Sequence, residues 1–231
     1  MDRIRPGVSV GFDWWRPYIA PDHYMAANRR HEAAHAVISE ALRQPVLEVR
    51  AGFQEATNTM GFVHAAPDVV PPQAQAVISL VGAPTEVRHL RQLGYDEEPN
   101  LLENIDAMAG SNDRGNVWHR IVRGEAIDVR RATATAHSLA LTHSGLDQAI
   151  SNVAQALQDR GDRLTGADVR AAMRGFELGP DDLWVPHPEE HRGIRSENAH
   201  MLREAGYEPA FDPGGGPPAE PDLAPDEDFE L

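Results

Sequence analysis

The spacing of apolar and polar residues predicts a chain of helices with one pair of strands near its start. Apolar residues recur at helical intervals from about residue 23 to residue 43, and the pattern stops before Pro45, because the residue before a proline disfavours helix. The next apolar segments, VLEVRAG (46–52) and TMGFVHA (59–65), are rich in β-prone residues around a polar turn and predict two strands. Further helices are expected at 73–94 with a kink or restart at Pro84, at 101–122 with a break at Gly110, at 126–143, at 146–161 and at 165–173. The expected fold class is mostly α, with a small β-hairpin or sheet.

Changes in composition divide the chain into an N-terminal arm (1–22), a main domain (23–176) and a C-terminal tail (177–231). The tail is rich in proline, glycine and acid, and residues 181–231 hold 14 acidic and 3 basic residues. Such a segment cannot bury enough apolar surface to offset the entropy lost on ordering. We therefore expect the tail to be largely disordered, apart from a short helix at 196–206.

The arm contains an aromatic cluster made of Trp14, Trp15 and Tyr18 beside two prolines. Aromatic side chains bury large apolar areas, so we expect the cluster to pack the arm onto the main domain. A ligand-binding aromatic patch is the alternative.

Composition narrows the possible functions. No run of eighteen apolar residues exists and no apolar signal segment begins the chain, so we expect no membrane span. Cysteine is absent, which excludes disulfides and thiolate ligands and fits a cytoplasmic location. All 21 basic residues are arginine, and without a lysine the chain cannot form a P-loop. A net charge of −15 argues against a nucleic-acid partner.

The motif HEAAH at residues 31–35 is the strongest chemical signal in the sequence. On a helix, His31 and His35 project from the same face and can bind one metal ion. Glu32 follows His31 directly in the sequence, and from this position it can take a proton from a zinc-activated water without binding the metal itself. Because both imidazoles must be deprotonated to bind, the affinity for zinc should fall as the pH falls.

A third ligand must come from elsewhere in the chain. The extended motif H-E-x-x-H-x-x-G-x-x-H is absent, because Ile38 and Ala41 occupy the positions of its glycine and third histidine. The remaining downstream candidates are His64, Glu86, His89 and Asp113. His64 ends an expected strand, where an edge or surface position is favoured, and His89 lies in a charged helical stretch, where we expect it to be solvated.

Several segments together resemble the zinc protease domain of the FtsH-type membrane-anchored ATP-dependent proteases. In the order of that family, HEAAHAVI is similar to its HEAGHA-type helix, the two expected strands to its strand pair, ISLVGAPTEV to its L-x-G-G-R-A-A-E-E helix and AGSNDRGNV to its T-G-A-x-N-D-L segment. LDQAISNVAQALQDRGDRLTGADVRAAM is similar to its closing helices, so the likeness covers about residues 23–175. The resemblance implies a zincin-like helical metalloprotease domain built around the HExxH helix.

By position, the resemblance makes Asp113 the third zinc ligand. It also implies that Glu86 supports the site by orienting a ligand histidine. Two histidines and one carboxylate leave a fourth position open for water, as a catalytic zinc site requires. Asn112, beside Asp113, is expected to cap the following helix; holding the carboxylate is its alternative role.

The sequence also departs from the family pattern. Ala34 replaces the usual glycine of the motif, and GAPTEV lacks the arginine and one acid of G-R-A-A-E-E. The family's ATPase module and membrane anchor have no counterpart in this sequence. We therefore expect an enzyme that cleaves flexible or exposed protein segments without ATP, or one that receives unfolded substrates from a separate ATPase. Because the family forms hexameric rings, homo-oligomerisation is a further expectation.

Two functions follow from these observations. The first is a metalloendopeptidase with one Zn²⁺ per chain that acts on protein or peptide substrates. The second is a catalytically weak or inactive relative that acts as a binding or regulatory module. In that case the acidic tail would recognise a basic partner.

Overall fold

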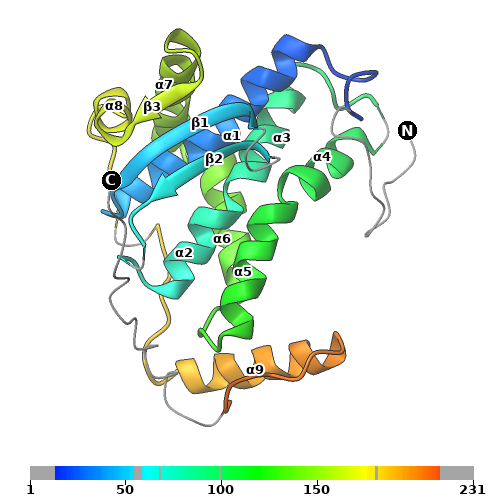
Figure 1. The fold of residues 1–231 in the computed structure, drawn as a ribbon, viewed down its shortest axis with the longest axis vertical. Helices are drawn as coiled ribbons and strands as arrows, with labels where there is room; N and C mark the ends of the chain where they lie inside the picture. The colour runs from blue at the N-terminus through cyan, green and yellow to red at the C-terminus, as the bar shows by residue number, and fades with distance from the viewer. Residues whose placement is uncertain (1–13, 55–58, 68, 99, 180–181, 214–231) are drawn as a thin grey trace, which may run out of the picture.

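The computed structural model describes residues 14–54, 59–67, 69–98, 100–179 and 182–213, and within these it is mostly α-helical with a small antiparallel sheet (Figure 1). The expectation of a mostly α fold with a small sheet is therefore confirmed, whereas the zincin-like fold implied by the resemblance stays a prediction. The elements in chain order are α1 (Pro21–Ala41), β1 (Val46–Gln54), β2 (Thr59–Ala65), α2 (Pro72–Leu80), α3 (Gly82–Gln92), α4 (Leu101–Ala109), α5 (Ser111–Val122), α6 (Val129–Thr142), α7 (Ser144–Asp159), β3 (Arg163–Thr165), α8 (Gly166–Ala172) and α9 (His191–Glu204).

The sheet has the order β2-β1-β3, so β2 lies at one edge. Val49 of β1 pairs with Val63 of β2 on one side and with Leu164 of β3 on the other. The two longer strands lie where the sequence predicted them. The third was not predicted, because three residues are too few to display the alternation that identifies a strand.

Helix α1 forms the centre of the molecule, behind the sheet in the view of Figure 1 and packed on α3, α7 and β1. Pro21 occupies its first turn, where the missing N–H costs nothing, and the helix ends before Pro45. The side chains of Ala33, Ala34 and Val37 are fully buried, since α1 is covered on several sides. Polar side chains on such a helix are buried too and require partners.

The helix expected at 73–94 consists of two helices, α2 and α3, that meet at Val81. The restart therefore comes one turn before Pro84. Pro84 itself lies in the first turn of α3, where backbone N–H groups have no partner within the helix. As a result Gly82, the first residue of α3, lies against α1.

Other predicted boundaries also hold. Helices α4 and α5 meet at Gly110, and Thr165 forms a capping box with Asp168 at the start of α8. The helix expected in the tail is α9, which begins at His191 rather than at residue 196. The last residues of the tail, 214–231, lie outside the described part of the chain, and so does the prediction that they are disordered. None of the described helices is long and apolar enough to cross a membrane.

Candidate metal centre

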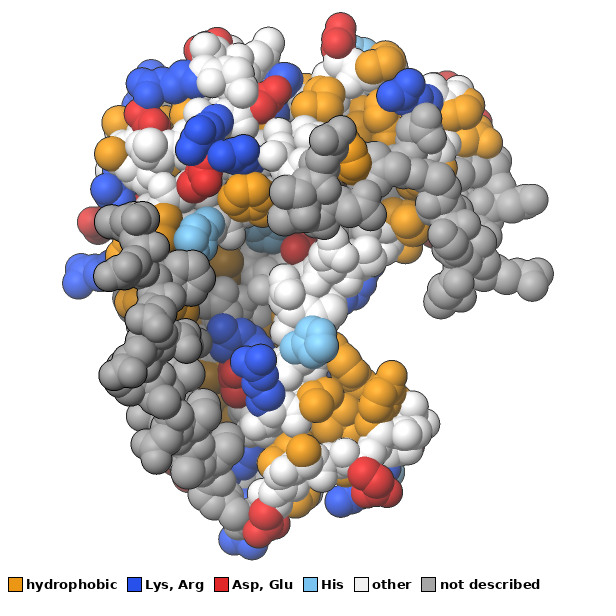
Figure 2. Space-filling view, in the orientation of Figure 1, with side chains coloured by type: hydrophobic (Ala, Val, Ile, Leu, Met, Phe, Trp, Pro, Cys, Tyr) orange, Lys and Arg blue, Asp and Glu red, His pale blue; other side chains and the backbone are white. Residues whose placement is uncertain are grey.

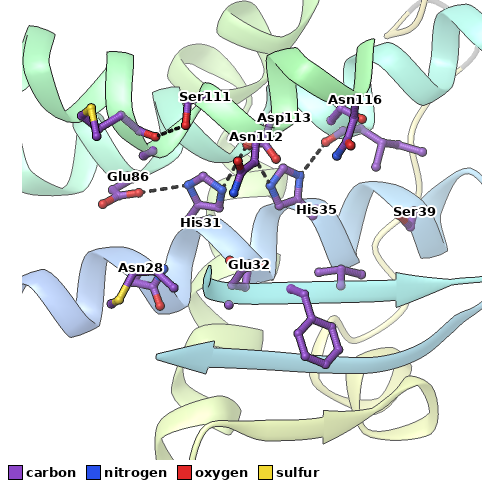
Figure 3. Close-up of a pocket in the computed structure, with 18 of the residues that line it drawn as sticks. Asn28, His31, Glu32, His35, Ser39, Glu86, Ser111, Asn112, Asp113 and Asn116 are labelled. Atoms are coloured by element: carbon purple, nitrogen blue, oxygen red, sulfur yellow. Dashed lines mark hydrogen bonds and ion pairs between the residues drawn. The ribbon is translucent and has the colours of Figure 1, made fainter. Parts of the chain in front are cut away.

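His31 and His35 occupy one face of α1, as the spacing of HEAAH predicts. Their ring centroids are 4.8 Å apart, and both side chains are buried. Figure 3 shows the two imidazoles pointing away from the sheet, towards the first turn of α5.

Asp113 in that first turn faces both histidines. Its Oδ2 lies 3.2 Å from Nε2 of His31 and 3.5 Å from Nε2 of His35. Ligands bound to zinc at about 2.0–2.1 Å in a tetrahedral arrangement lie roughly 3.3 Å apart, so these separations suit a shared ion. The structure thus brings together a buried His31, His35 and Asp113 group that could hold a metal ion.

Each histidine has an acceptor at its other ring nitrogen. Nδ1 of His31 lies 3.0 Å from Oε2 of Glu86, and Nδ1 of His35 lies 2.6 Å from the backbone oxygen of Ile78. An acceptor at Nδ1 favours the tautomer that carries its proton there, which leaves the Nε2 lone pair directed at the ion. Glu86 therefore lies where it can orient the ring of His31.

The electrostatics of the group favour a cation. Burial alone would lower the pKa of His31, but the neighbouring carboxylates of Asp113 and Glu86 outweigh it and raise that pKa. Burial would likewise raise the pKa of Asp113, but His35 and His31 hold it below its usual range. Oδ2 of Asp113 is also buried without a hydrogen-bond partner among the described residues. A divalent cation would satisfy this oxygen and offset the clustered carboxylates.

Gly82 leaves room for the ion. A Cβ atom at this position would lie 2.5 Å from Nε2 of both His31 and His35, closer than real Cβ contacts allow. The space in front of the two ligand nitrogens therefore exists because α3 begins with a residue that has no side chain.

Glu32 is buried on the same helix but faces β2 instead of Asp113 (Figure 3). Its carboxylate lies against Gly61 of β2, where a Cβ atom would be 2.5 Å from Oε1. Burial raises the pKa of Glu32 to about 7; Asp113 and Glu86 act in the same direction, and His31 and His35 oppose them. A carboxylate in this position is suited to proton transfer beside the metal rather than to binding it.

A cavity of about 500 Å³ opens onto these residues. One wall is the face of α1, a second is β2, and a third comes from the end of α4 and the start of α5. Figure 2 shows the recess on this face, with acidic and histidine side chains at its centre. β2 is an edge strand that borders the cavity, and on its outer side it pairs with no other strand of the described residues.

The other candidate ligands lie elsewhere. His64 is exposed on β2, as expected, whereas His89 is half-buried in α3 and so is not fully solvated. The prediction that Asn112 caps α5 is wrong, because Gly110 is the cap residue and Asn112 lies inside the first turn, lining the cavity. The sequence did not reveal the roles of Gly61, Gly82 and the Ile78 carbonyl, since each depends on close approach between separate elements.

Replacing Glu86 by glutamine should weaken zinc binding about tenfold without abolishing it. Glutamine can still accept a hydrogen bond from His31, but it removes the negative charge that makes the imidazole a stronger ligand. Titration with a competing chelator at fixed pH measures the change. A complete loss of zinc would instead identify Glu86 as a ligand, and an unchanged affinity would show that it has no influence on His31.

Neither a protein-family model nor a curated protein sequence matches this chain, so the resemblance to the FtsH-type protease domain stays a prediction.

Proposed function

We propose that this chain is a zinc-dependent endopeptidase that cleaves extended or flexible protein segments without using ATP itself. The observation that carries the proposal is the convergence of His31, His35 and Asp113 on one point, with the buried Glu32 beside it, in a cavity bordered by an edge strand. Two imidazoles and one carboxylate are a common ligand set of catalytic zinc, and they leave a coordination position open.

Zinc bound by these residues would lower the pKa of a water molecule and polarise the scissile carbonyl. Glu32 takes the proton from the attacking water and delivers it to the leaving amine. Glu86 and the Ile78 carbonyl keep the two histidines in the orientation that the site requires.

The edge of β2 offers a way to hold a substrate. An extended peptide can form backbone hydrogen bonds with an unpaired strand edge, and these bonds do not depend on its side chains. Met60, Gly61, Phe62, Val63 and Ala65 all border the cavity. A peptide on this edge would pass in front of Glu32, which contacts Gly61.

Zinc-loaded protein should cleave casein, an unstructured protein, and 1,10-phenanthroline should abolish the cleavage. Adding back zinc in excess of the chelator should restore it, because the ligand residues remain in place when the ion is removed. Gel electrophoresis and mass spectrometry of the fragments provide the measurement.

A folded substrate of similar size is the control, since without an unfolding motor it should resist cleavage. If zinc-loaded protein leaves casein and a library of unstructured peptides intact, the enzymatic proposal fails. Cleavage that survives removal of the metal would point to a contaminating protease or to a mechanism without zinc.

A further inference from the structure

Residues 14–20, the end of the N-terminal arm that the structure describes, pack on the main domain. Trp15 is buried and stacks on Tyr24 of α1 with ring centroids 3.9 Å apart, and Ile19 is buried beside them. The Tyr95 hydroxyl accepts a hydrogen bond of 3.1 Å from the backbone N–H of Ala20. These contacts confirm that the described end of the arm packs on the domain through Trp15, although Tyr18 is exposed, and they hold the neighbouring Trp14 in a defined place.

Trp14 is not part of this buried core: it is partly exposed and lines the cavity of the candidate metal centre. Tyr24 and Met60 line the same cavity, and Trp14 and Met60 both pack against the cluster that contains Tyr24. The arm therefore supplies one wall of an apolar corner at the end of the cavity where α1 begins.

The cavity follows α1 for a length that suits a peptide. Tyr24, Asn28, His35 and Ser39 line it from one helix face. Along the helix axis Tyr24 and Ser39 are about 22 Å apart at ~1.5 Å per residue, which is the length of roughly seven extended residues at ~3.3 Å each. Tyr24 precedes Glu32 by about 12 Å on the same scale, or about four extended residues.

The charges around the cavity restrict what can enter this corner. The chain has 21 arginines, yet none lines the cavity among the described residues. Its ionisable lining, apart from the histidines and Tyr24, consists of the carboxylates of Glu32, Glu86 and Asp113. No lining arginine could pair with an acidic side chain in this corner, whereas an apolar side chain would bury its surface against aromatic rings.

We propose that Trp14, Tyr24 and Met60 form a specificity subsite for one large, uncharged apolar side chain of a peptide, within about four residues of the bond that is cleaved. This inference rests on the proposed endopeptidase function and names the class of substrate that it selects. Trp14 is the specificity-determining residue, and it belongs to the arm rather than to the segments that resemble a protease domain.

The test uses ten-residue peptides of alanine, serine and glutamine that carry a fluorophore and a quencher, with a single phenylalanine moved through each position. At one position the phenylalanine should raise kcat/KM of the zinc-loaded wild type about tenfold to hundredfold over alanine. Aspartate at that position should lower it. Trp14→Ala should lower the ratio of kcat/KM for the phenylalanine peptide to kcat/KM for the peptide without phenylalanine towards one, and Trp14→Phe should keep part of the gain.

Tyr18→Ala is the matched control, because Tyr18 lies on the same arm, is exposed and is not among the lining residues. It should leave the preference unchanged. If the wild type cleaves every peptide equally, or if the preference survives in Trp14→Ala, the subsite is refuted while the endopeptidase function stands. If no peptide is cleaved, the proposed function fails, and fluorescence anisotropy of the same peptides then decides the subsite: tighter binding of the phenylalanine peptide that is lost in Trp14→Ala supports it, and equal binding refutes it.

Discussion

Replacing Glu32 by glutamine should reduce casein cleavage by a factor of about 10² to 10⁴ while the protein still binds one zinc ion per chain. Glutamine has nearly the same shape as glutamate and fits the space beside Gly61, but it cannot accept a proton from the attacking water. Glu32 lies outside the group formed by His31, His35 and Asp113, so the metal should stay in place. Peptide kinetics and metal analysis of the same sample measure the two quantities together.

Glu197→Gln is the matched control, because it makes the same chemical change at an exposed position on α9. It should alter neither the rate of casein cleavage nor the zinc content. A Glu32→Gln variant that is as active as wild type would contradict the role of Glu32 as the base. The variant also separates the two functions expected from the sequence. If a basic partner is bound through residues 181–231 equally well by both proteins, and neither cleaves any peptide, the binding-module alternative is favoured.

Most helices and the two longer strands were predictable, because short-range patterns of residues determine them. Residue spacing, turn chemistry and capping predicted four features: the helix that carries HEAAH, the pair β1 and β2, the break at Gly110 and the cap at Thr165. The strand β3 and the break at Val81 were not predictable in the same way. Three residues give no alternation, and Pro84 predicted a restart of the helix but not that it comes one turn earlier, at Val81.

The candidate site was likewise predictable only where its residues lie close together in the sequence. Spacing alone placed His31, Glu32 and His35 on one helix, but it left four residues open as the third ligand. The choice of Asp113 came from a family resemblance, and the structure places this residue against both histidines while His64 stays exposed. No sequence motif indicates a functional role for Trp14. Its position at the cavity follows from the stacking of its neighbour Trp15 on Tyr24, a contact that residue spacing does not encode.

Replacing Gly82 by alanine should weaken zinc binding by more than about a hundredfold. This loss is larger than the tenfold to hundredfold loss of metal affinity that usually follows removal of a residue that orients a ligand. The added methyl group would lie 2.5 Å from Nε2 of His31 and of His35, in the space where the ion has to sit. The rings cannot move aside cheaply, because Glu86 and the Ile78 carbonyl hold their Nδ1 atoms. Competitive chelator titration measures the affinity.

Gly115→Ala is the matched control. Gly115 lies in α5, two residues after Asp113, and a Cβ atom there would meet nothing within 4 Å. This variant should bind zinc like the wild type, and because alanine is about 1 kcal/mol more favourable than glycine within a helix, it should unfold at a slightly higher urea concentration.

Urea unfolding of the metal-free Gly82→Ala protein separates loss of the site from loss of the fold. We expect a cooperative transition that is about 1–3 kcal/mol less stable than the metal-free wild type, because the added methyl group crowds the rings of His31 and His35. Asp113→Asn provides a second route to the same conclusion, since it removes a ligand charge without adding an atom and should also lose zinc. If Gly82→Ala and Asp113→Asn both retain wild-type affinity, the ion does not bind between His31, His35 and Asp113, and the catalytic role proposed for Glu32 loses its basis as well.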